Sequence, residues 1–190
     1  MMKFWFLLEV EKLSREVFFM VKFLCDGMLG RIARWLRLLG YDTLYSSLST
    51  DEELVKLAEK EERVLLTKDV ELYRHALKSG IKVLLVEGND FETMLAHIIK
   101  CFGILPKINP ELSRCPKCNG EMQHIPVDEA KKLKLDIPET TLKVYKDFWV
   151  CKNCRKTYWK GRMWNNMIKT LERVKEKVKT SHFSIFDNAQ

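Results

Sequence analysis

Two Cys-x-x-Cys pairs in the second half of this chain restrict its fold more than any other feature of the sequence. The pairs are Cys115-Pro-Lys-Cys118 and Cys151-Lys-Asn-Cys154. Four thiolates on two short loops suit a tetrahedral zinc ion, and four protein ligands leave no position open for catalysis. Disulfides would need an oxidising compartment, and no export signal supports one. The sequence therefore predicts a small zinc ribbon holding a structural Zn²⁺ ion, in a cytoplasmic protein.

The segment before these cysteines alternates between short apolar runs and amphipathic stretches. Apolar residues spaced three and four apart predict helices, and short apolar runs bounded by turn residues predict strands. We expect strands at 21–25, 43–45, 64–67 and 81–86, and helices at 28–39, 51–61, 70–78 and 91–102. This alternation predicts an α/β fold with a parallel sheet between two layers of helices. No Gly-x-Gly-x-x-Gly or Walker loop points to a bound nucleotide.

The remaining segments are arranged around this α/β domain, which we assign to 21–105. Residues 1–20 are expected to be a soluble extension, because their apolar stretch breaks at Glu9 and no small-residue cleavage site follows. No apolar run approaches the roughly 20 residues of a membrane span. We expect a linker at 106–111, the zinc ribbon at 112–162, and a basic C-terminal helix and tail at 163–190. Within these, we expect a helical stretch near 127–133, a strand near 142–150 and a helix from about 162 to 179.

Three aspartates follow predicted strands. Asp26 comes directly after the first strand and Asp69 directly after the third, while Asp51 opens the helix after the second. Because parallel strands end at the same edge of a sheet, these carboxylates are expected there together. Carboxylates are usual ligands of Mg²⁺ or Mn²⁺, which can activate water for attack on phosphorus. Each also has an ordinary explanation, as a helix cap, a first-turn acid or a turn residue.

Further residues of this edge are weaker candidates. Asp90 follows the fourth predicted strand and is a candidate fourth acid, and Glu52 or Glu53 would replace Asp51 if the helix starts differently. Thr67 lies two residues before Asp69. It would either orient a water molecule or a carboxylate, or simply pack within its strand.

Positive charge is concentrated in the second half of the chain. Residues 106–190 carry 18 basic and 10 acidic side chains, within a whole-chain net charge of +7. Clustered cations attract phosphate backbones, although a solvated Lys/Glu surface is also common in proteins of heat-loving organisms. On the first predicted helix, Arg31, Arg34 and Arg37 are spaced three apart opposite the apolar stripe. They form either a surface for a nucleic-acid backbone or a solvated face.

Several of these motifs together resemble a known family. They are the segments Phe23–Arg31, Trp35–Asp42 and Leu65–Asp69, the two cysteine pairs, and Tyr158-Trp159-Lys160-Gly161. In combination they are similar to the Mut-seven C-terminal ribonuclease family, a branch of the PIN-like nucleases with a fused zinc ribbon. The resemblance covers about 22–168. The family often has a histidine where this chain has Met163.

The resemblance implies a PIN-like domain with an acidic Mg²⁺ or Mn²⁺ site that hydrolyses single-stranded RNA. The acids of the family pattern fall on Asp26, Asp51 and Asp69. Cleavage would leave a 5′-phosphate and a 3′-hydroxyl. The ribbon is expected to aid RNA binding through basic and aromatic side chains, although the aromatics could instead fill its core. These side chains are Lys152, Arg155, Lys156, Tyr158, Trp159, Lys160 and Arg162.

Two other functions remain open at this point. One is a non-catalytic RNA-binding protein in RNA or ribosome maturation, built on a degenerate nuclease fold. The other is a phosphatase or receiver-like protein with Asp26 as its nucleophile, although Met28 stands where one large phosphatase class has a second aspartate. A protein partner or an antitoxin is compatible with the sequence.

Overall fold

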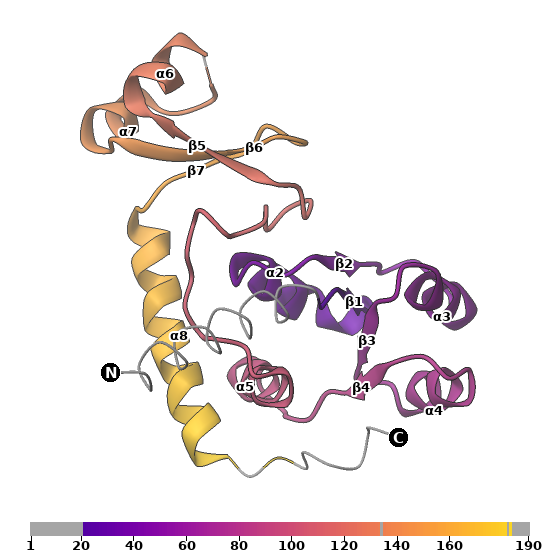
Figure 1. The fold of residues 1–190 in the computed structure, drawn as a ribbon. Coiled ribbons are helices and arrows are strands. Elements are labelled where there is room, and N and C mark those ends of the chain that lie inside the picture. The colour runs from indigo at the N-terminus through magenta and orange to yellow at the C-terminus, as the bar shows by residue number, and fades with distance from the viewer. Residues whose placement is uncertain (1–20, 134, 182, 184–190) are drawn as a thin grey trace, which may run out of the picture.

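The structure is a computed structural model that describes residues 21–133, 135–181 and 183. The predicted extension at 1–20 and the end of the predicted tail lie outside the described residues. The described chain forms a parallel sheet with flanking helices, followed by a smaller antiparallel sheet. A long C-terminal helix then runs from the antiparallel sheet back to the helices of the parallel sheet (Figure 1).

The parallel sheet has four short strands in the order β2-β1-β3-β4. In this sheet Cys25 is opposite both Tyr45 and Leu66, so the central strands end almost level with one another. The predicted parallel sheet is confirmed. Its strands are β1 (Phe23–Cys25), β2 (Thr43–Tyr45), β3 (Val64–Thr67) and β4 (Val83–Leu85).

Helices cover both faces of this sheet, with α2 and α5 on one side and α3 and α4 on the other (Figure 1). Side chains alternate between the faces of a strand. Accordingly, Phe23 and Cys25 pack with α2 and α5, whereas Leu24 packs with α3 and α4. The helices are α2 (Gly30–Leu38), α3 (Asp51–Lys60), α4 (Val70–Lys78) and α5 (Phe91–Phe102), and the 3-10 turn η1 (Gly27–Leu29) precedes α2.

Local sequence signals fix the ends of these helices. Thr50 accepts a hydrogen bond from the N–H of Glu53, whose carboxylate accepts one from the N–H of Thr50, so α3 starts with a capping box. At the C-terminal end of α5, Gly103 ends the helix with a left-handed φ of 60° that glycine adopts readily. These boundaries agree with the sequence to within one or two residues.

The antiparallel sheet has the order β5-β6-β7 and carries the two cysteine loops. We call residues 112–161 the ribbon. The predicted strand near 142–150 is wrong in its first half, because a helical turn occupies 139–144, and the first strand of this sheet was not predicted. The ribbon elements are β5 (Met122–Pro126), α6 (Val127–Lys132), α7 (Glu139–Val144), β6 (Asp147–Cys151) and β7 (Thr157–Tyr158).

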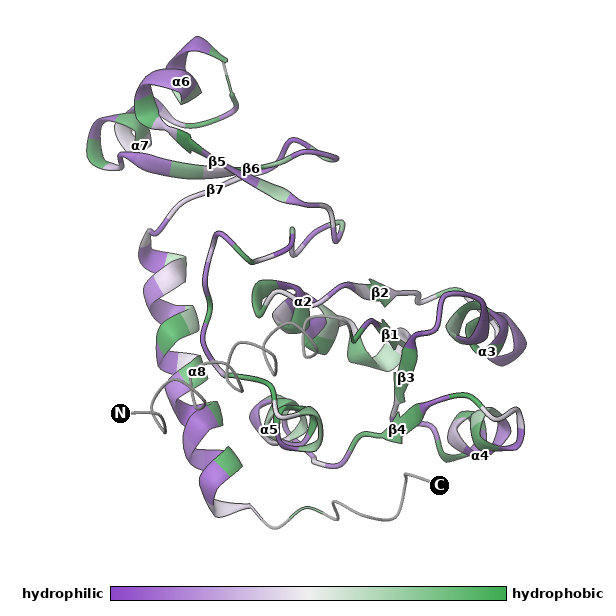
Figure 2. Ribbon diagram, in the orientation of Figure 1, coloured by the Kyte–Doolittle hydropathy of each residue, from purple (hydrophilic) through white to green (hydrophobic). Residues whose placement is uncertain are grey.

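Helix α8 (Arg162–Thr180) packs along α5. Leu171 and Val174 are buried in the same core cluster as α2 and α5. Figure 2 shows α8 as mostly hydrophilic with hydrophobic residues along its length, which is the pattern of a helix that buries one stripe. The basic C-terminal helix therefore returns to the α/β part, while the domain boundaries inferred from the sequence stay predictions.

Within the described residues, none of the helices is both long and apolar enough to cross a lipid bilayer.

Candidate functional site

The carboxylate of Asp26 is buried and held in one orientation at the carboxyl end of β1. Its Oδ1 accepts a hydrogen bond from the N–H of Met28 at 2.8 Å. Its Oδ2 accepts from the hydroxyl of Thr67 and, at 3.4 Å, from the N–H of Lys68. The side chain is only 5% exposed. Hydrogen bonds to a carboxylate fix its orientation as well as stabilising its charge, so the direction of the Asp26 carboxylate is set by its donors.

Asp69 is joined to Asp26 through the same threonine. While Thr67 donates to Asp26, its Oγ1 accepts from the N–H of Asp69 at 2.8 Å. Asp69 also caps α4, because its Oδ1 accepts from the N–H groups of Glu71 and Leu72 at 2.7 and 3.1 Å. Both caps use Oδ1, which leaves Oδ2 of this exposed side chain without a hydrogen bond to the described chain. The capping and the ligand interpretations of Asp69 are therefore compatible.

Asp51 lies at the same edge but apart from this network. It is exposed in the first turn of α3. Across 21–133, 135–181 and 183, the four cysteines are the only group of three or more potential metal ligands that converges. Asp26, Asp51 and Asp69 thus share the carboxyl side of neighbouring strands without meeting at one point.

Asp90, the weaker fourth candidate, is engaged by α8. Its two oxygens accept from the N–H and the hydroxyl of Thr93 as the cap of α5, and Lys177 donates to Oδ2 at 3.3 Å. The hydrogen bonds from Thr93, assisted by Lys177, lower the pKa of Asp90 to about 2. Sequence reasoning missed Lys177, since nothing local connects positions so far apart.

The three arginines of α2 do not form one open basic face. Arg31 and Arg34 are exposed, and the guanidinium carbon of Arg31 lies 3.8 Å from the centre of the Phe91 ring. Arg37 is instead buried. Its Nε donates to the carbonyl oxygen of Thr43 at 2.8 Å, and its Nη1 donates to that of Pro116 at 3.0 Å. The expectation that Arg37 shares a solvent-facing surface is corrected, because its hydrogen-bonding groups face the protein interior.

The four predicted zinc ligands converge. Their Sγ atoms all lie within 4.8 Å of one another, with 3.7 Å between Cys115 and Cys154 and 3.4 Å between Cys118 and Cys151. Sulfurs at about 2.3 Å from a tetrahedral zinc ion would be about 3.8 Å apart. None of the four takes part in a disulfide. The donor set and its spacing therefore fit a structural zinc ion.

The aromatic residues predicted to stack on RNA have contacts inside the ribbon. The Tyr158 hydroxyl lies 3.2 Å from Sγ of Cys115, and Trp159 packs against the apolar cluster that contains Phe148. Lys160 is exposed, and its Nζ lies 5.2 Å from the centre of the Trp149 ring. These contacts favour the alternative in which both aromatics stabilise the ribbon, while Lys156 and Lys160 stay accessible.

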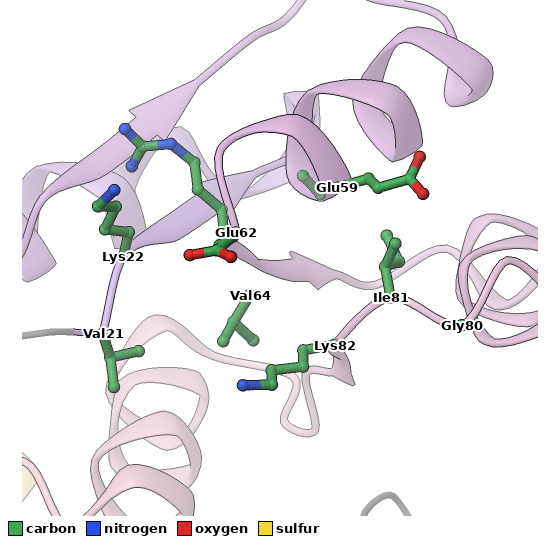
Figure 3. A pocket seen from close by; sticks show the side chains of 10 residues that line it. Val21, Lys22, Glu59, Glu62, Val64, Gly80, Ile81 and Lys82 are labelled. Carbon is green, nitrogen blue, oxygen red and sulfur yellow. The ribbon is translucent and has the colours of Figure 1, made fainter.

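A hollow of about 500 Å³ lies at the opposite, amino end of the strands (Figure 3). Lys22, Glu62 and Lys82 line it, from the segments before β1, β3 and β4. It is therefore separate from the carboxylate edge. It also borders Val21, before which the chain lies outside the described residues.

Residues 21–171 match the model of the family described as the Mut7-C RNAse domain. The match spans the parallel sheet, the cysteine loops and the first half of α8. No curated protein and no solved structure matches the chain. The description of the family indicates a ribonuclease-related function.

Proposed function

The chain belongs to the Mut7-C RNAse domain family, and from that premise we propose that it is a PIN-like, Mg²⁺- or Mn²⁺-dependent ribonuclease that hydrolyses single-stranded RNA. The single observation that carries this proposal is the Asp26–Thr67–Asp69 arrangement at the carboxyl edge of adjacent parallel strands. Ligand sites in parallel α/β sheets lie at this edge. A buried carboxylate with three donors has a fixed direction that a merely solvated acid lacks.

The carboxylate set suits a hard divalent cation held partly through water. Mg²⁺ usually keeps several waters and takes only one or two protein carboxylates, so acids that share an edge without converging are compatible with it. Asp26 and Asp69 would be the nearer ligands, and Asp51 would act through water. When bound, the ion would supply an activated water and stabilise charge on the phosphate.

The side chains of the protein have distinct tasks in this proposal. Thr67 holds Asp26 and the backbone of Asp69 in register, so the two carboxylates keep a constant spacing. Exposed cations on α2, on the ribbon and at the start of α8 would attract the RNA backbone. Those with exposed side chains are Arg31, Arg34, Lys152, Arg155, Lys156, Lys160 and Arg162.

A structural zinc ion would hold the two cysteine loops together, with Cys115, Cys118, Cys151 and Cys154 as its ligands. Its task would be to keep the ribbon folded. The ribbon would contribute to RNA binding through lysines and arginines, and not through stacking of Tyr158 or Trp159.

A second candidate is a non-catalytic RNA-binding protein. The observation that favours it is the spacing of Asp51 from the Asp26–Asp69 pair, because a degenerate site would lose convergence of its acids. Both candidates predict affinity for RNA, so binding alone does not separate them.

Cleavage of an end-labelled single-stranded RNA separates the two. The protein would be loaded with zinc, treated briefly with EDTA, and assayed before and after addition of Mg²⁺ or Mn²⁺. We expect cutting only after addition, with zinc content unchanged and with 5′-phosphate ends on the products. RNA binding without cutting under either metal would favour the binding protein.

A further inference from the structure

Three apolar side chains beside the carboxylate edge are exposed to solvent, although burial of an apolar side chain is favourable. Met28 is 69% exposed in η1, two residues after Asp26, and Leu48 is 94% exposed in the loop after β2. Tyr45 at the end of β2 is 39% exposed. Single exposed apolar residues are common on protein surfaces. Here, however, three lie on two adjacent segments next to a proposed catalytic carboxylate, and we call them the Met28–Tyr45–Leu48 patch.

Tyr45 is fixed in place and is not a freely rotating side chain. Its hydroxyl donates to the carbonyl oxygen of Gly27 at 3.2 Å. Its ring packs so closely on Gly30 that a Cβ atom there would lie 2.9 Å from the ring carbon Cζ. In the sheet Tyr45 pairs with Cys25, the residue before Asp26. The ring is therefore rigidly held on the strand that neighbours β1.

The loop that carries Leu48 is also ordered by its own hydrogen bonds. The hydroxyls of Ser46 and Ser49 lie 2.6 Å apart, and the N–H of Ser49 donates to Oγ of Ser46 at 3.1 Å. The loop touches η1, because a Cβ atom on Gly27 would lie 3.4 Å from Cα of Ser47. Leu48 thus projects from a closed turn that is anchored against the segment of Asp26.

The apolar and aromatic character of the Met28–Tyr45–Leu48 patch favours a nucleobase as its ligand. Unpaired bases stack on aromatic and apolar side chains whatever the nucleotide sequence, whereas paired bases are not available for stacking. A protein partner needs about 800 Å² on each side for a stable interface, far more than three side chains offer. Arg31, an exposed residue in the first turn of α2 whose guanidinium carbon lies 3.8 Å from the centre of the Phe91 ring, would attract the phosphate backbone of the bound strand.

We propose that the Met28–Tyr45–Leu48 patch binds an unpaired base of the RNA and thereby positions the adjacent phosphate at Asp26. The inference rests on the proposed ribonuclease function, and it assigns selection of single strands to this patch instead of the ribbon aromatics. The three residues are positioning residues, since the carboxylates act on the phosphate.

The test compares Leu48→Ser and the double variant Tyr45→Ala/Leu48→Ser with a matched control, Leu77→Ser. Leu77 is a 44% exposed leucine in the last turn of α4, at the opposite edge of the sheet. Substrates are a single-stranded oligoribonucleotide, the same strand with abasic positions around the cleaved linkage, and its duplex. Both KM and kcat are measured, together with the equilibrium dissociation constant in the presence of Ca²⁺ and the urea midpoint.

For the double variant we expect KM and Kd for the normal strand to rise about tenfold, with kcat changed less than about threefold. For the abasic strand, KM and Kd of the double variant should equal those of the wild type. A general loss of folding would not give this result, because it would weaken binding of both strands. Tyr45→Phe in place of Tyr45→Ala should recover most of the binding, because it restores the ring. Leu77→Ser should have the KM, kcat and Kd of the wild type.

Equal KM and Kd for the double variant and the Leu77→Ser control would overturn the inference. The same penalty on normal and abasic strands would overturn it too, because the patch would then not contact bases. Absence of cutting by the wild type under both metals would count against the proposed ribonuclease, and the Kd comparison would still decide the role of the patch.

Discussion

Arg37, in the last turn of α2, donates from Nη1 to the carbonyl oxygen of Pro116 at 3.0 Å, inside the first Cys-x-x-Cys loop. The same guanidinium donates from Nε to the carbonyl oxygen of Thr43 at the start of β2. Asn119 makes a second bridge, accepting from the N–H of Thr43 and donating to Asp42. The cysteine loop is therefore fastened to the amino edge of the parallel sheet, on the side opposite the carboxylates.

Replacing Arg37 should destabilise the whole protein. Arg37→Ala removes charged donors from buried carbonyl groups, each worth about 1.5–3 kcal/mol, so we expect a loss of about 3 kcal/mol in the free energy of unfolding. Arg34→Ala, one turn earlier and exposed, should change it by less than about 0.5 kcal/mol. Urea denaturation of both variants measures the difference. Equal midpoints would contradict a bridging role for Arg37.

Loss of zinc should increase hydrogen exchange at the edge of the parallel sheet as well as in the ribbon. Metal binding contributes directly to the folding of four-cysteine sites. After chelation, or in Cys118→Ser, we expect faster hydrogen exchange at the N–H of Thr43 and the N–H of Arg114, which bond to Asn119 and Arg37 across the junction. The N–H of Leu72, at the start of α4, serves as the distant reference. Unchanged exchange at Thr43 would show that the loop and the sheet are uncoupled.

His97 should make the protein less stable below neutral pH. Its ring is 1% exposed, its Nδ1 accepts from the N–H of Glu87 at 2.9 Å, and its Nε2 has no hydrogen-bond partner among the described residues. Burial lowers the pKa of His97, only partly opposed by Glu87. Since the unfolded chain binds the proton more readily, stability is full above the unfolded pKa of about 6.5 and falls as the pH drops from there toward the lowered folded pKa.

His97→Gln keeps an acceptor for the N–H of Glu87 but does not titrate. Its urea midpoint should therefore fall less than that of the wild type between pH 7 and pH 5. Parallel curves for the two proteins over this range would exclude His97 as the source of the pH dependence.

Asp90 should matter for stability more than for cleavage. Asp90→Ala removes the cap of α5 and the partner of Lys177, and loss of such a cap costs about 1 kcal/mol. Cleavage by Asp90→Ala should stay within about threefold of the wild type when assayed well below the unfolding temperature. A loss of activity as large as that of Asp69→Ala, at unchanged fold, would instead make Asp90 a fourth ligand.

The sequence predicted those parts of the fold that depend on neighbouring residues. The capping box at Thr50 and the left-handed Gly103 fix helix ends locally, and strand–helix alternation was enough to place Asp26 and Asp69 on one edge. The turn at 139–144 was missed because its Thr and Val residues favour strands, while a single helical turn is decided by its surroundings.

Contacts across long stretches of chain were out of reach of sequence reasoning. The spacing of Arg37 with Arg31 and Arg34 indicated a common basic face, but the carbonyl group that Arg37 binds belongs to a residue 79 positions away. The internal contacts of Tyr158 and Trp159 could not be predicted for the same reason. Their partners Cys115 and Phe148 come from other strands or loops of the ribbon.

The most direct test of the account is RNA cleavage by Asp26→Asn, measured beside RNA binding, zinc content and the urea midpoint. We predict a loss of cleavage of at least about 100-fold, with RNA affinity within about threefold of the wild type and the bound zinc unchanged. Cleavage by Asp26→Asn at the wild-type rate, with the same dependence on Mg²⁺ or Mn²⁺, would contradict the assignment of Asp26 as the central ligand of a ribonuclease site.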